Sequence, residues 1–548
     1  MGKAFYIFLL FKYMYSKIKI LISVFILMNS TSISIAQSSD IEDANDLFLS
    51  KSYLKAIPVF KTLLQTEENT NLYYKLGLCY FNLNKEISAI PYFEKAIKDV
   101  YKKYNVTNIS LTHASVDAYY YFAKSQHVNG NIILAFEFYN KFFDVCKKKN
   151  PLRCKAYAGI LQCEIAYDLL KHKTNDIIWG LGDTINTTAN EYRPVMTSDG
   201  TSIFFTSARL RPDKTNRNFI NPATGTYFED IYVSDKTEDG KWTEPNYLPF
   251  CKPTQNEASI STTFNGDKLF VYNGHSGNGD VYTSEVEFLD FENLKPFPAK
   301  DLNTNQNESH ASLSADGKYL FFVSDRKGGF GGDDIYRMKK LPDGTWSKAQ
   351  NLGSTINSKF DEVSPFIGSD NRTLYFSSNG VKSMGGYDIF MSQQNVLEIW
   401  SEPKNLGFPL NSTDDDLYYS TTPDGFTGMF SSDRNLNQNH DIYFSQTSVS
   451  YYKNVTIFKG QIKTKSSNTL PRGITIEVND LTISSSPVLF KPRLKDGVYI
   501  LNLKPCHTYS IKYKYSNKTF YQIEKLVPCN SSYQEIHEEV ILDLIKLK

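Results

Sequence analysis

The pattern of hydrophobic and polar positions changes along this 548-residue chain. Residues 40–173 carry small and large apolar residues at the spacing of paired helices. Residues 177–447 and 452–548 instead carry short runs of alternating apolar and polar residues, separated by turn-forming residues, as in half-buried β-strands. The pattern predicts a multidomain protein that is α-helical at first and all-β afterwards.

Small residues set the expected packing of the helical region. In three successive copies two of them stand twelve positions apart, where crossing helices need room: Ala44 and Ala56, Gly77 and Ala89, Ala123 and Ala135. Large neighbours such as Tyr80 and Phe93 fill the groove, and residues 152–172 fit a closing helix. The copies resemble the tetratricopeptide repeat, a helical array whose concave face binds peptides or protein segments. A plain helical spacer is the alternative.

A repeated tripeptide, Asp-Ile-Tyr or a close variant, organises residues 177–447. The copies follow one another at steps of 50, 54, 54 and 53 residues, and they begin at Asp230, Asp280, Asp334, Asp388 and Asp441. A period of about 40 to 55 residues built from short strands is typical of a β-propeller.

Each propeller unit begins with an acidic residue before a short strand, and these residues are Glu191, Glu257, Glu308, Glu362 and Asp416. Five such units predict five blades, with a sixth, degenerate blade as the alternative. The last unit lacks a final strand, whereas Leu181-Gly182 and Ile185-Asn186 match the residues around that strand in other units. We therefore expect a strand near residues 177–182 to complete the fifth blade and to remove an open sheet edge.

Residues 452–548 are expected to form a small antiparallel β-sandwich of about seven strands. Alternating segments stand at 455–460, 474–478, 498–501 and 509–513, and Asp496-Gly497 is a turn signal between them. Gly460, Leu470-Pro471 and Gly497-x-Tyr499 resemble the carboxypeptidase regulatory-like domain, a transthyretin-like sandwich.

The propeller units also resemble a known repeat, the PD40 or TolB-like WD40 repeat of the Bacteroidota envelope. They share the order Asn-Glu, Asp-Gly, Phe-x-Ser-x-Arg, Asp-Ile-Tyr and Trp-x-x-Pro-x-Asn-Leu-Gly. Together with the helical repeats and the sandwich, the chain resembles the PorE-like proteins of the type IX secretion and gliding group. That group typically ends in an OmpA-like domain that binds peptidoglycan. This chain ends at Lys548, after the sandwich, so peptidoglycan anchoring is not expected.

The N-terminus has the features of a secretory signal peptide over residues 1–36. Lys17 and Lys19 precede the apolar run 20–28, and Ser34-Ile35-Ala36 fits the cleavage site. The start is Met1 or Met14. We therefore expect a periplasmic or secreted protein with no membrane span, and a net charge of +1 argues against nucleic-acid partners.

Export permits disulfide bonds among the seven cysteines. Cys506 and Cys529 lie in one small domain and can pair, and Cys146 can pair with Cys154 or Cys163. Buried free thiols are the alternative for these cysteines. Their spacing fits no zinc motif.

The five acidic residues that begin the units are expected to ring one mouth of the propeller channel. There they hold a cation or a basic segment, or else pair with Arg209, Arg326 and Arg434 and lock the blades. Units two and four lack this arginine, so Glu257 and Glu362 are expected to be the exposed ligands. A long loop, 209–229, is a second candidate binding element, or else a merely mobile loop, and it carries Arg209, Arg211, Lys214 and Arg217.

Motifs for catalysis are not evident. The glycine-rich residues 328–332 lead into a strand, which indicates a hairpin and not a phosphate site. No catalytic residues, metal ligands or cofactor are predicted. We expect a non-enzymatic adaptor or scaffold that binds envelope proteins or protein segments, accessory to type IX secretion, gliding or outer-membrane assembly. A binder of carbohydrate or peptidoglycan fragments is the alternative, and a propeller hydrolase is a third hypothesis.

Overall fold

The computed structural model describes residues 40–543, except 67, 109, 223, 275–278, 288, 289, 292, 436–438, 466–468, 484, 485 and 531. The predicted signal peptide, residues 1–36, lies outside the described residues. Within the described ranges, no helix is long and apolar enough to cross a membrane. The chain divides into two compact units, Met1–Cys163 and Glu164–Lys548.

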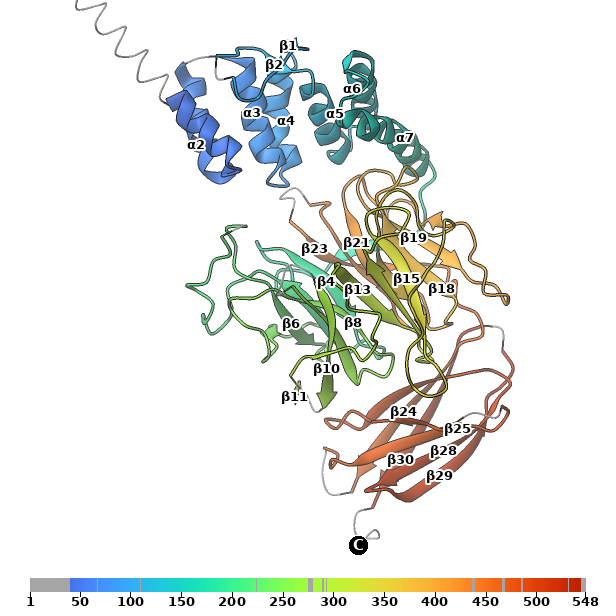
Figure 1. Cartoon of the computed structure of the whole chain (residues 1–548). Coiled ribbons are helices and arrows are strands. Elements are labelled where there is room, and N and C mark those ends of the chain that lie inside the picture. Colours follow the sequence, from blue (N-terminus) through green and yellow to red (C-terminus); the bar gives the residue numbers. More distant parts are fainter. Residues whose placement is uncertain are drawn as a thin grey trace, which may run out of the picture. The chain divides into compact units, whose positions relative to one another are not determined.

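The first unit is helical. Residues 40–49 are helical, and the helices after them are α2 (Tyr53–Thr66), α3 (Thr70–Phe81), α4 (Glu86–Ala96), α5 (Ala118–Val128), α6 (Ile132–Val145) and α7 (Leu152–Lys171). A short parallel pair, β1 (Val100–Tyr101) and β2 (Ala114–Ser115), lies between α4 and α5. Figure 1 shows these helices in blue and teal.

The small residues act where the sequence predicts them to act. Gly77, Ala89 and Phe93 are buried where α3 meets α4. A Cβ atom at Gly77 would lie 2.6 Å from the Phe93 ring, so only glycine allows this approach of the two helices. Gly159 of α7 meets the ring of Tyr139 in the same way, at 2.6 Å.

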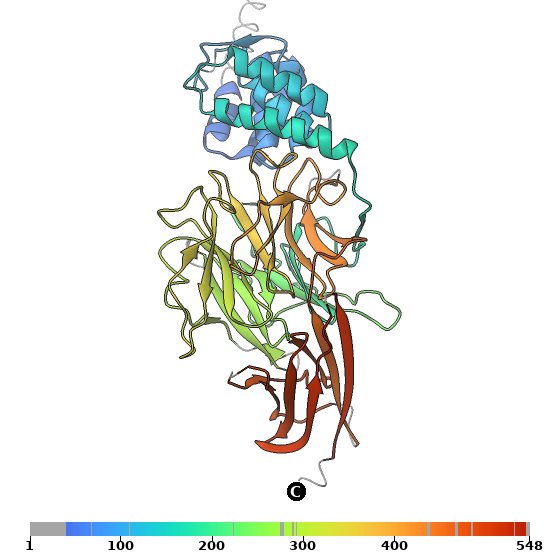
Figure 2. The same cartoon turned by 90° about the vertical axis from the view of Figure 1, so that its right-hand side faces the viewer.

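The second unit starts within α7, at Glu164, and continues with antiparallel sheets, which we number one to five along the chain (Figures 1 and 2). Sheet one has β4 (Glu191–Met196), β5 (Ser202–Ser207), β6 (Asp230–Asp235) and β7 (Asn246–Tyr247). Sheet two has β8 (Glu257–Thr262), β9 (Lys268–Asn273), β10 (Asp280–Glu287), β11 (Asp290–Phe291) and β12 (Lys295–Pro296). Sheet three has β13 (Glu308–Leu313), β14 (Tyr319–Ser324), β15 (Asp334–Lys339) and β16 (Gln350–Asn351).

Sheet four has β17 (Glu362–Ile367), β18 (Thr373–Ser378), β19 (Asp388–Gln393) and β20 (Lys404–Asn405). Sheet five has β21 (Asp416–Thr421), β22 (Thr427–Ser432), β23 (Asp441–Gln446) and β3 (Ile177–Gly180). In every sheet the acidic residue begins the first strand and the Asp-Ile-Tyr tripeptide begins the third strand.

The five first strands form a closed ring. β4 contacts β8, β8 contacts β13, β13 contacts β17, β17 contacts β21, and β21 returns to β4. The N-terminal strand completes the last sheet, as the sequence predicts, because β3 pairs with β23 from Gly180 opposite Tyr443 to Ile177 opposite Gln446. Asn186 supports this closure, since its amide exchanges two hydrogen bonds with the backbone of Ile442, of 3.0 and 2.9 Å.

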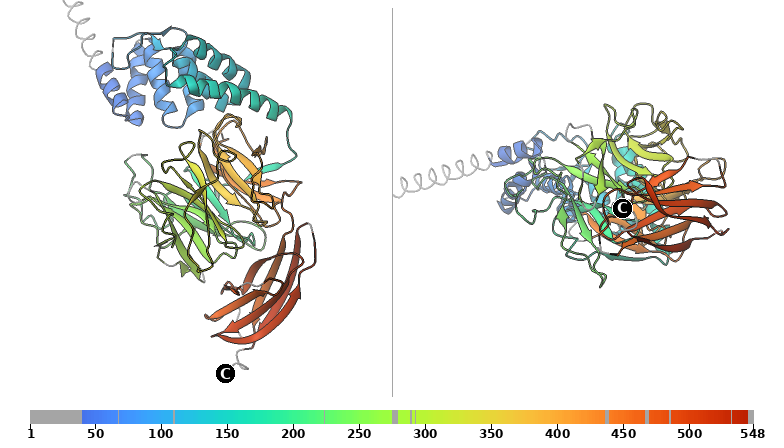
Figure 3. Two further views of the ribbon diagram at one scale, coloured as in Figure 1. Left: turned by 45° about the vertical axis from the view of Figure 1, so that its right-hand side comes forward. Right: turned by 90° about the horizontal axis from the view of Figure 1, so that it is seen from below.

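The C-terminal residues form two packed sheets, drawn in red in Figure 3. One holds β24 (Thr456–Thr464), β27 (Val498–Leu503) and β30 (Gln534–Leu542), and the other β25 (Ile474–Asp480), β26 (Val488–Phe490), β28 (Thr508–Tyr515) and β29 (Lys518–Leu526). They share a core that includes Phe458, Ile476 and Tyr513. The expectation of a wholly antiparallel sandwich is wrong at one place, because β24 and β30 pair in parallel.

The cysteine pattern is also settled by this fold. Cys506 and Cys529 are joined by a disulfide. Among the described residues Cys146, Cys154 and Cys163 form no disulfide bond, so the alternative pairings among them are wrong. The C-terminal sheets pack on sheets four and five through a common apolar cluster that includes Tyr375, Tyr419, Tyr452 and Ile457.

Candidate functional site at the ring of first strands

The acidic residues that begin the first strands are buried and bonded within their own sheets. Glu308 is typical: the N–H and hydroxyl of Thr304 donate to it at 2.8 and 2.9 Å, Ser324 Oγ donates at 2.7 Å, and Arg326 Nη2 donates at 3.2 Å. Arg209 pairs with Glu191 and Arg434 with Asp416 in the same way. The alternative that Arg209, Arg326 and Arg434 pair with these carboxylates is therefore confirmed, and the prediction that the carboxylates hold a ligand at the channel mouth is wrong.

Sheets two and four lack the arginine, yet their acidic residues are not exposed. Glu257 and Glu362 are each 1 % exposed, so the prediction that they are the accessible ligands is wrong. Glu362 still accepts bonds from Ser358 N–H, Ser358 Oγ and Ser378 Oγ, at 2.7, 2.7 and 2.8 Å. The backbone and hydroxyl donors that Glu362 shares with Glu308 therefore bind this buried carboxylate without a cation.

Glu257 lacks the hydroxyl groups that donate hydrogen bonds to the equivalent carboxylates in the other sheets. Pro253 stands where the other sheets have a serine or threonine, and Asn273 stands where they have a serine. Lys252 N–H donates to Glu257 at 3.4 Å, a long bond. Burial in this setting raises the pKa of Glu257 from 4.5 to about 7.

The loop 209–229 divides into buried and exposed cations. Arg209 is bonded to Ser207 and pairs with Glu191, as above. Arg211 is 3 % exposed, and its Nε and Nη2 donate to both oxygens of Asp230, at 2.8 and 2.5 Å. Lys214 and Arg217 are exposed. Two of the four predicted binding cations are thus part of the scaffold, and a binding role stays a prediction for the other two.

One group of side chains in the described residues has the spacing of metal ligands. Ligand atoms of Asp230, Cys251 and Glu257 lie within 4.8 Å of one another, and all three residues are buried. The Arg211 guanidinium occupies both oxygens of Asp230, and a cation there repels a metal ion. The geometry thus favours an internal ion pair over a metal centre.

A different set of carboxylates lies at the end of the ring where the first strands begin. We call this set the acidic mouth. Each member stands next in sequence to a buried residue, and the members are Asp325, Asp333, Asp361, Asp415 and Asp433. Asp325 is exposed and the others are half-buried. Burial, and then repulsion from Asp361 and Asp325, raises the pKa of Asp333 to about 6. Burial also raises the pKa of Asp433, His440 lowers it as the next cause, and Asp415 raises it further. Repulsion therefore acts within two groups of carboxylates, one of Asp325, Asp333 and Asp361 and one of Asp415 and Asp433.

Two members of the acidic mouth also latch neighbouring sheets. Asp361 accepts the N–H of Asp333 at 3.2 Å, and Asp415 accepts the N–H of Tyr387 at 2.9 Å. At the equivalent junctions the acceptors are asparagines, because Asn190 accepts from His440 and Asn256 from Glu229. An amide oxygen therefore serves the latch as well as a carboxylate does, and the negative charge of Asp361 and Asp415 is not required by the fold.

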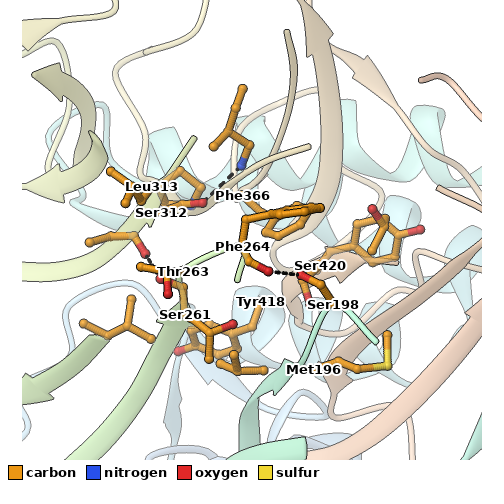
Figure 4. A pocket seen from close by; sticks show the side chains of 18 of the residues that line it. Met196, Ser198, Ser261, Thr263, Phe264, Ser312, Leu313, Phe366, Tyr418 and Ser420 are labelled. Carbon is orange, nitrogen blue, oxygen red and sulfur yellow. Dashed lines mark hydrogen bonds between the residues drawn. The ribbon is translucent and has the colours of Figure 1, made fainter. Parts of the chain in front are cut away.

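The interior of the ring holds a cavity of about 80 Å³, lined by all five first strands. Figure 4 shows its walls, where Ser198 Oγ donates to the carbonyl of Phe264 at 2.6 Å and Ser312 Oγ accepts from Ile367 N–H at 3.2 Å. His310, Ser364 and Tyr418 also line it. Each stands two residues after the acidic residue of its strand, the register that Arg193 occupies in β4, and the Arg193 guanidinium lies 5.3 Å from the centre of the Tyr418 ring. Sequence reasoning missed this position because the five strands carry different residues there.

Comparisons with known proteins place the fold only broadly. No protein-family model and no curated protein matches the chain. Among solved structures, TolB from Acinetobacter baumannii is 16% identical over 49% of this chain and 56% of that chain, with a TM-score of 0.29. This chain therefore spans just over half of that TolB.

Two further solved structures are similar to parts of the chain. A putative TolB from Agrobacterium tumefaciens is 12% identical over 66% of this chain and 91% of that chain, with a TM-score of 0.30. The C-terminal part of a TPR repeat-containing protein from Cytophaga hutchinsonii is 24% identical over 24% of this chain and 45% of that chain, with a TM-score of 0.18. TM-scores this low support no assignment of function to this chain. The class is set by the strand order: a helical part followed by antiparallel sheets that fit an all-β propeller.

Proposed function

We propose that the protein is a non-enzymatic adaptor of the bacterial cell envelope, located in the periplasm or secreted. In this proposal the helical unit is a tetratricopeptide-repeat array, and the ring is a five-bladed propeller of the PD40 type closed by β3. The C-terminal sheets form a carboxypeptidase regulatory-like domain. The protein serves type IX secretion, gliding or outer-membrane assembly by binding partner proteins, and the sequence resemblance to the PorE-like group supports this role.

The acidic mouth is the observation that carries the proposal. Burial, and then repulsion from Asp361 and Asp325, raises the pKa of Asp333 to about 6, and a basic partner segment would relieve the repulsive part of this cost. Asp361 and Asp415 carry charges that the sheet latches do not need, since asparagine serves elsewhere. Complementary charge at such a rim speeds association and selects the partner. The propeller therefore binds a lysine- or arginine-rich segment of an envelope protein.

Crosslinking in intact periplasm followed by affinity capture tests the adaptor role. Recovery of secretion or outer-membrane proteins with the full mature chain supports it. Binding to a glycan array without any captured protein would overturn it in favour of the carbohydrate alternative. Hydrolysis by the purified protein that one point substitution abolishes would exclude both binding functions.

Charge variants then test the acidic mouth itself. The double variant Asp361→Asn/Asp415→Asn keeps the latch acceptors and removes two charges, so the fold is retained and the captured partner binds about tenfold more weakly at low salt. The matched control is Asp239→Asn/Asp343→Asn, which removes two exposed carboxylates from hairpin turns of sheets one and three. Equal affinities for the two double variants would refute the role of the acidic mouth.

A further inference from the structure

Arg193 is a buried cation without a carboxylate partner. It stands in the β-bulge of β4, with a positive φ of 52°, and its side chain is 9 % exposed. Nη1 donates to the carbonyl of Ser309 at 3.3 Å, and Nε has no hydrogen-bond partner among the described residues. Glu229 acts on it electrostatically, as the weakest of several influences, and forms no ion pair with it in the described structure. A buried guanidinium without a paired carboxylate is destabilising, because burial removes its hydration and no opposite charge replaces it.

Aromatic rings hold this guanidinium without neutralising it. Its central carbon lies 5.0 Å from the ring centre of Tyr272, 5.3 Å from that of Tyr418 and 5.9 Å from that of Tyr192. Cation–π contacts of this kind fix the position of the group. Among the described residues no carboxylate forms an ion pair with Arg193, and the ring of strands holds the guanidinium in place for an anion.

Two further polar atoms without partners lie at the same level of the ring. His310 Nε2 and Ser364 Oγ have no hydrogen-bond partner among the described residues, and their side chains are 7 % and 6 % exposed. His310 Nδ1 is 2.7 Å from Ser309 Oγ, and the imidazole stacks on Tyr418 at 5.3 Å. Burial and then the charge of Arg193 hold the pKa of His310 well below its ordinary value, so the ring is neutral. With the Ser309 hydroxyl donating to Nδ1, the ring presents its proton on Nε2.

We propose that Arg193, His310 and Ser364 form a buried anion site whose ligand is a carboxylate group. Arg193, His310 and Ser364 stand at the same register position of three first strands and offer unpartnered donors and one positive charge, which matches one carboxylate with its two oxygen atoms and single negative charge. The cavity that His310 and Ser364 line measures about 80 Å³, which leaves room for a small acid or the end of a peptide chain. The site is separate from the acidic mouth and does not depend on the adaptor function.

Titration of the full mature chain with sodium acetate, at ionic strength held constant with sodium chloride, tests the site. Saturable binding by calorimetry, with a rise in melting temperature, is the expected result. Arg193→Met weakens acetate binding by about tenfold or more, as the loss of a charge-assisted hydrogen bond implies. The matched control is Arg434→Met, which removes a partly buried arginine that is paired with Asp416. It destabilises the fold and leaves acetate binding unchanged.

A second variant keeps the test decisive if Arg193→Met does not fold. Ser364→Ala removes one donor and a single oxygen atom, and it weakens acetate binding several-fold without loss of structure. Triglycine and its C-terminal amide then distinguish the source of the carboxylate. If the ligand is a peptide C-terminus, triglycine binds and its amide does not. If the ligand is a small acid, acetate binds and neither peptide does. No saturable acetate binding by the wild-type protein, or equal binding by wild type and Ser364→Ala, would mean that Arg193 is solvated by water alone and would overturn the proposal.

Discussion

Replacing Glu257 with glutamine is expected to stabilise the second unit at neutral and alkaline pH. Glu257 is 1 % exposed and has a pKa of about 7 against an ordinary value of 4.5. The folded state therefore disfavours the ionised form. The rise corresponds to a cost of about 3 kcal/mol when the carboxyl is fully ionised. Glutamine has nearly the same shape and carries no charge, so the variant avoids this cost.

The sign of the pH dependence follows from proton binding. Between pH 4.5 and about 7 the folded protein binds more protons than the unfolded chain, so the stability of the wild type falls as pH rises through this range. Below pH 4.5 the carboxyl is protonated in both states, and Glu257→Gln has little effect. Above pH 7 the variant is more stable, by up to about 3 kcal/mol. Urea unfolding followed by tryptophan fluorescence at pH 5 and pH 8 measures the difference.

Glu308→Gln is the matched control, because Glu308 occupies the same position in sheet three and is paired with Arg326. Removing that charge leaves a partly buried cation unpaired, so this variant loses stability at pH 8. The reasoning would be refuted if Glu257→Gln were destabilising at pH 8, or if its effect did not change between pH 5 and pH 8.

Three further variants test other parts of the fold. Asn186→Ala removes both bonds to the backbone of Ile442 and lowers unfolding stability in urea by about 1–3 kcal/mol; an equal effect of Asn218→Ala, at an exposed site, would contradict this. Gly77→Ala forces a methyl group against Phe93 and lowers the thermal stability of the helical unit, by about 1–3 kcal/mol; Phe93→Leu in the same chain should recover part of the loss. Burial lowers the pKa of Lys75 to about 8, so wild-type stability rises from pH 8 to 10.5. Lys75→Met is therefore expected to raise the unfolding stability at pH 7, and this gain should be smaller at pH 10. A gain in stability that does not depend on pH would exclude the lowered pKa of Lys75 as its cause.

The repeat in the sequence predicts the sheets and their internal order because every sheet needs the same parts. The Asp-Ile-Tyr aspartate illustrates this: Asp334 accepts bonds from the N–H groups of Phe330 and Gly331, and Asp388 from that of Met384. Such local bonds recur at fixed distances along the chain, so their residues recur too. The closing strand β3 was predictable for the same reason, since Asn186 repeats the asparagine that brackets the third strand in other sheets.

The acidic residues show where sequence reasoning fails. Their position at the start of each first strand was predicted correctly, and their burial in sheets two and four was not. Whether a carboxylate faces the channel or its own sheet depends on the partners that folding brings to it. Ser378 and Glu362 are 16 residues apart in sequence and in contact in the sheet. The absence of an arginine therefore predicts an exposed carboxylate only when no other hydrogen-bond donor contacts that carboxylate in the fold.

The sequence by itself determined the order of helical and β regions, the period of the sheets, the strand that closes the ring and the glycine contacts between helices. Each of these depends on residues close in the chain or on a repeated pattern. Only the tertiary structure brought Arg193, His310 and Ser364 together, and it alone placed Asp333, Asp361 and Asp415 at one end of the ring. These sets come from different sheets, and their residues differ from sheet to sheet. Arg193, His310 and Ser364 occupy one repeating position, but no shared residue type marks it, because closure of the ring creates the proximity and no local interaction indicates it.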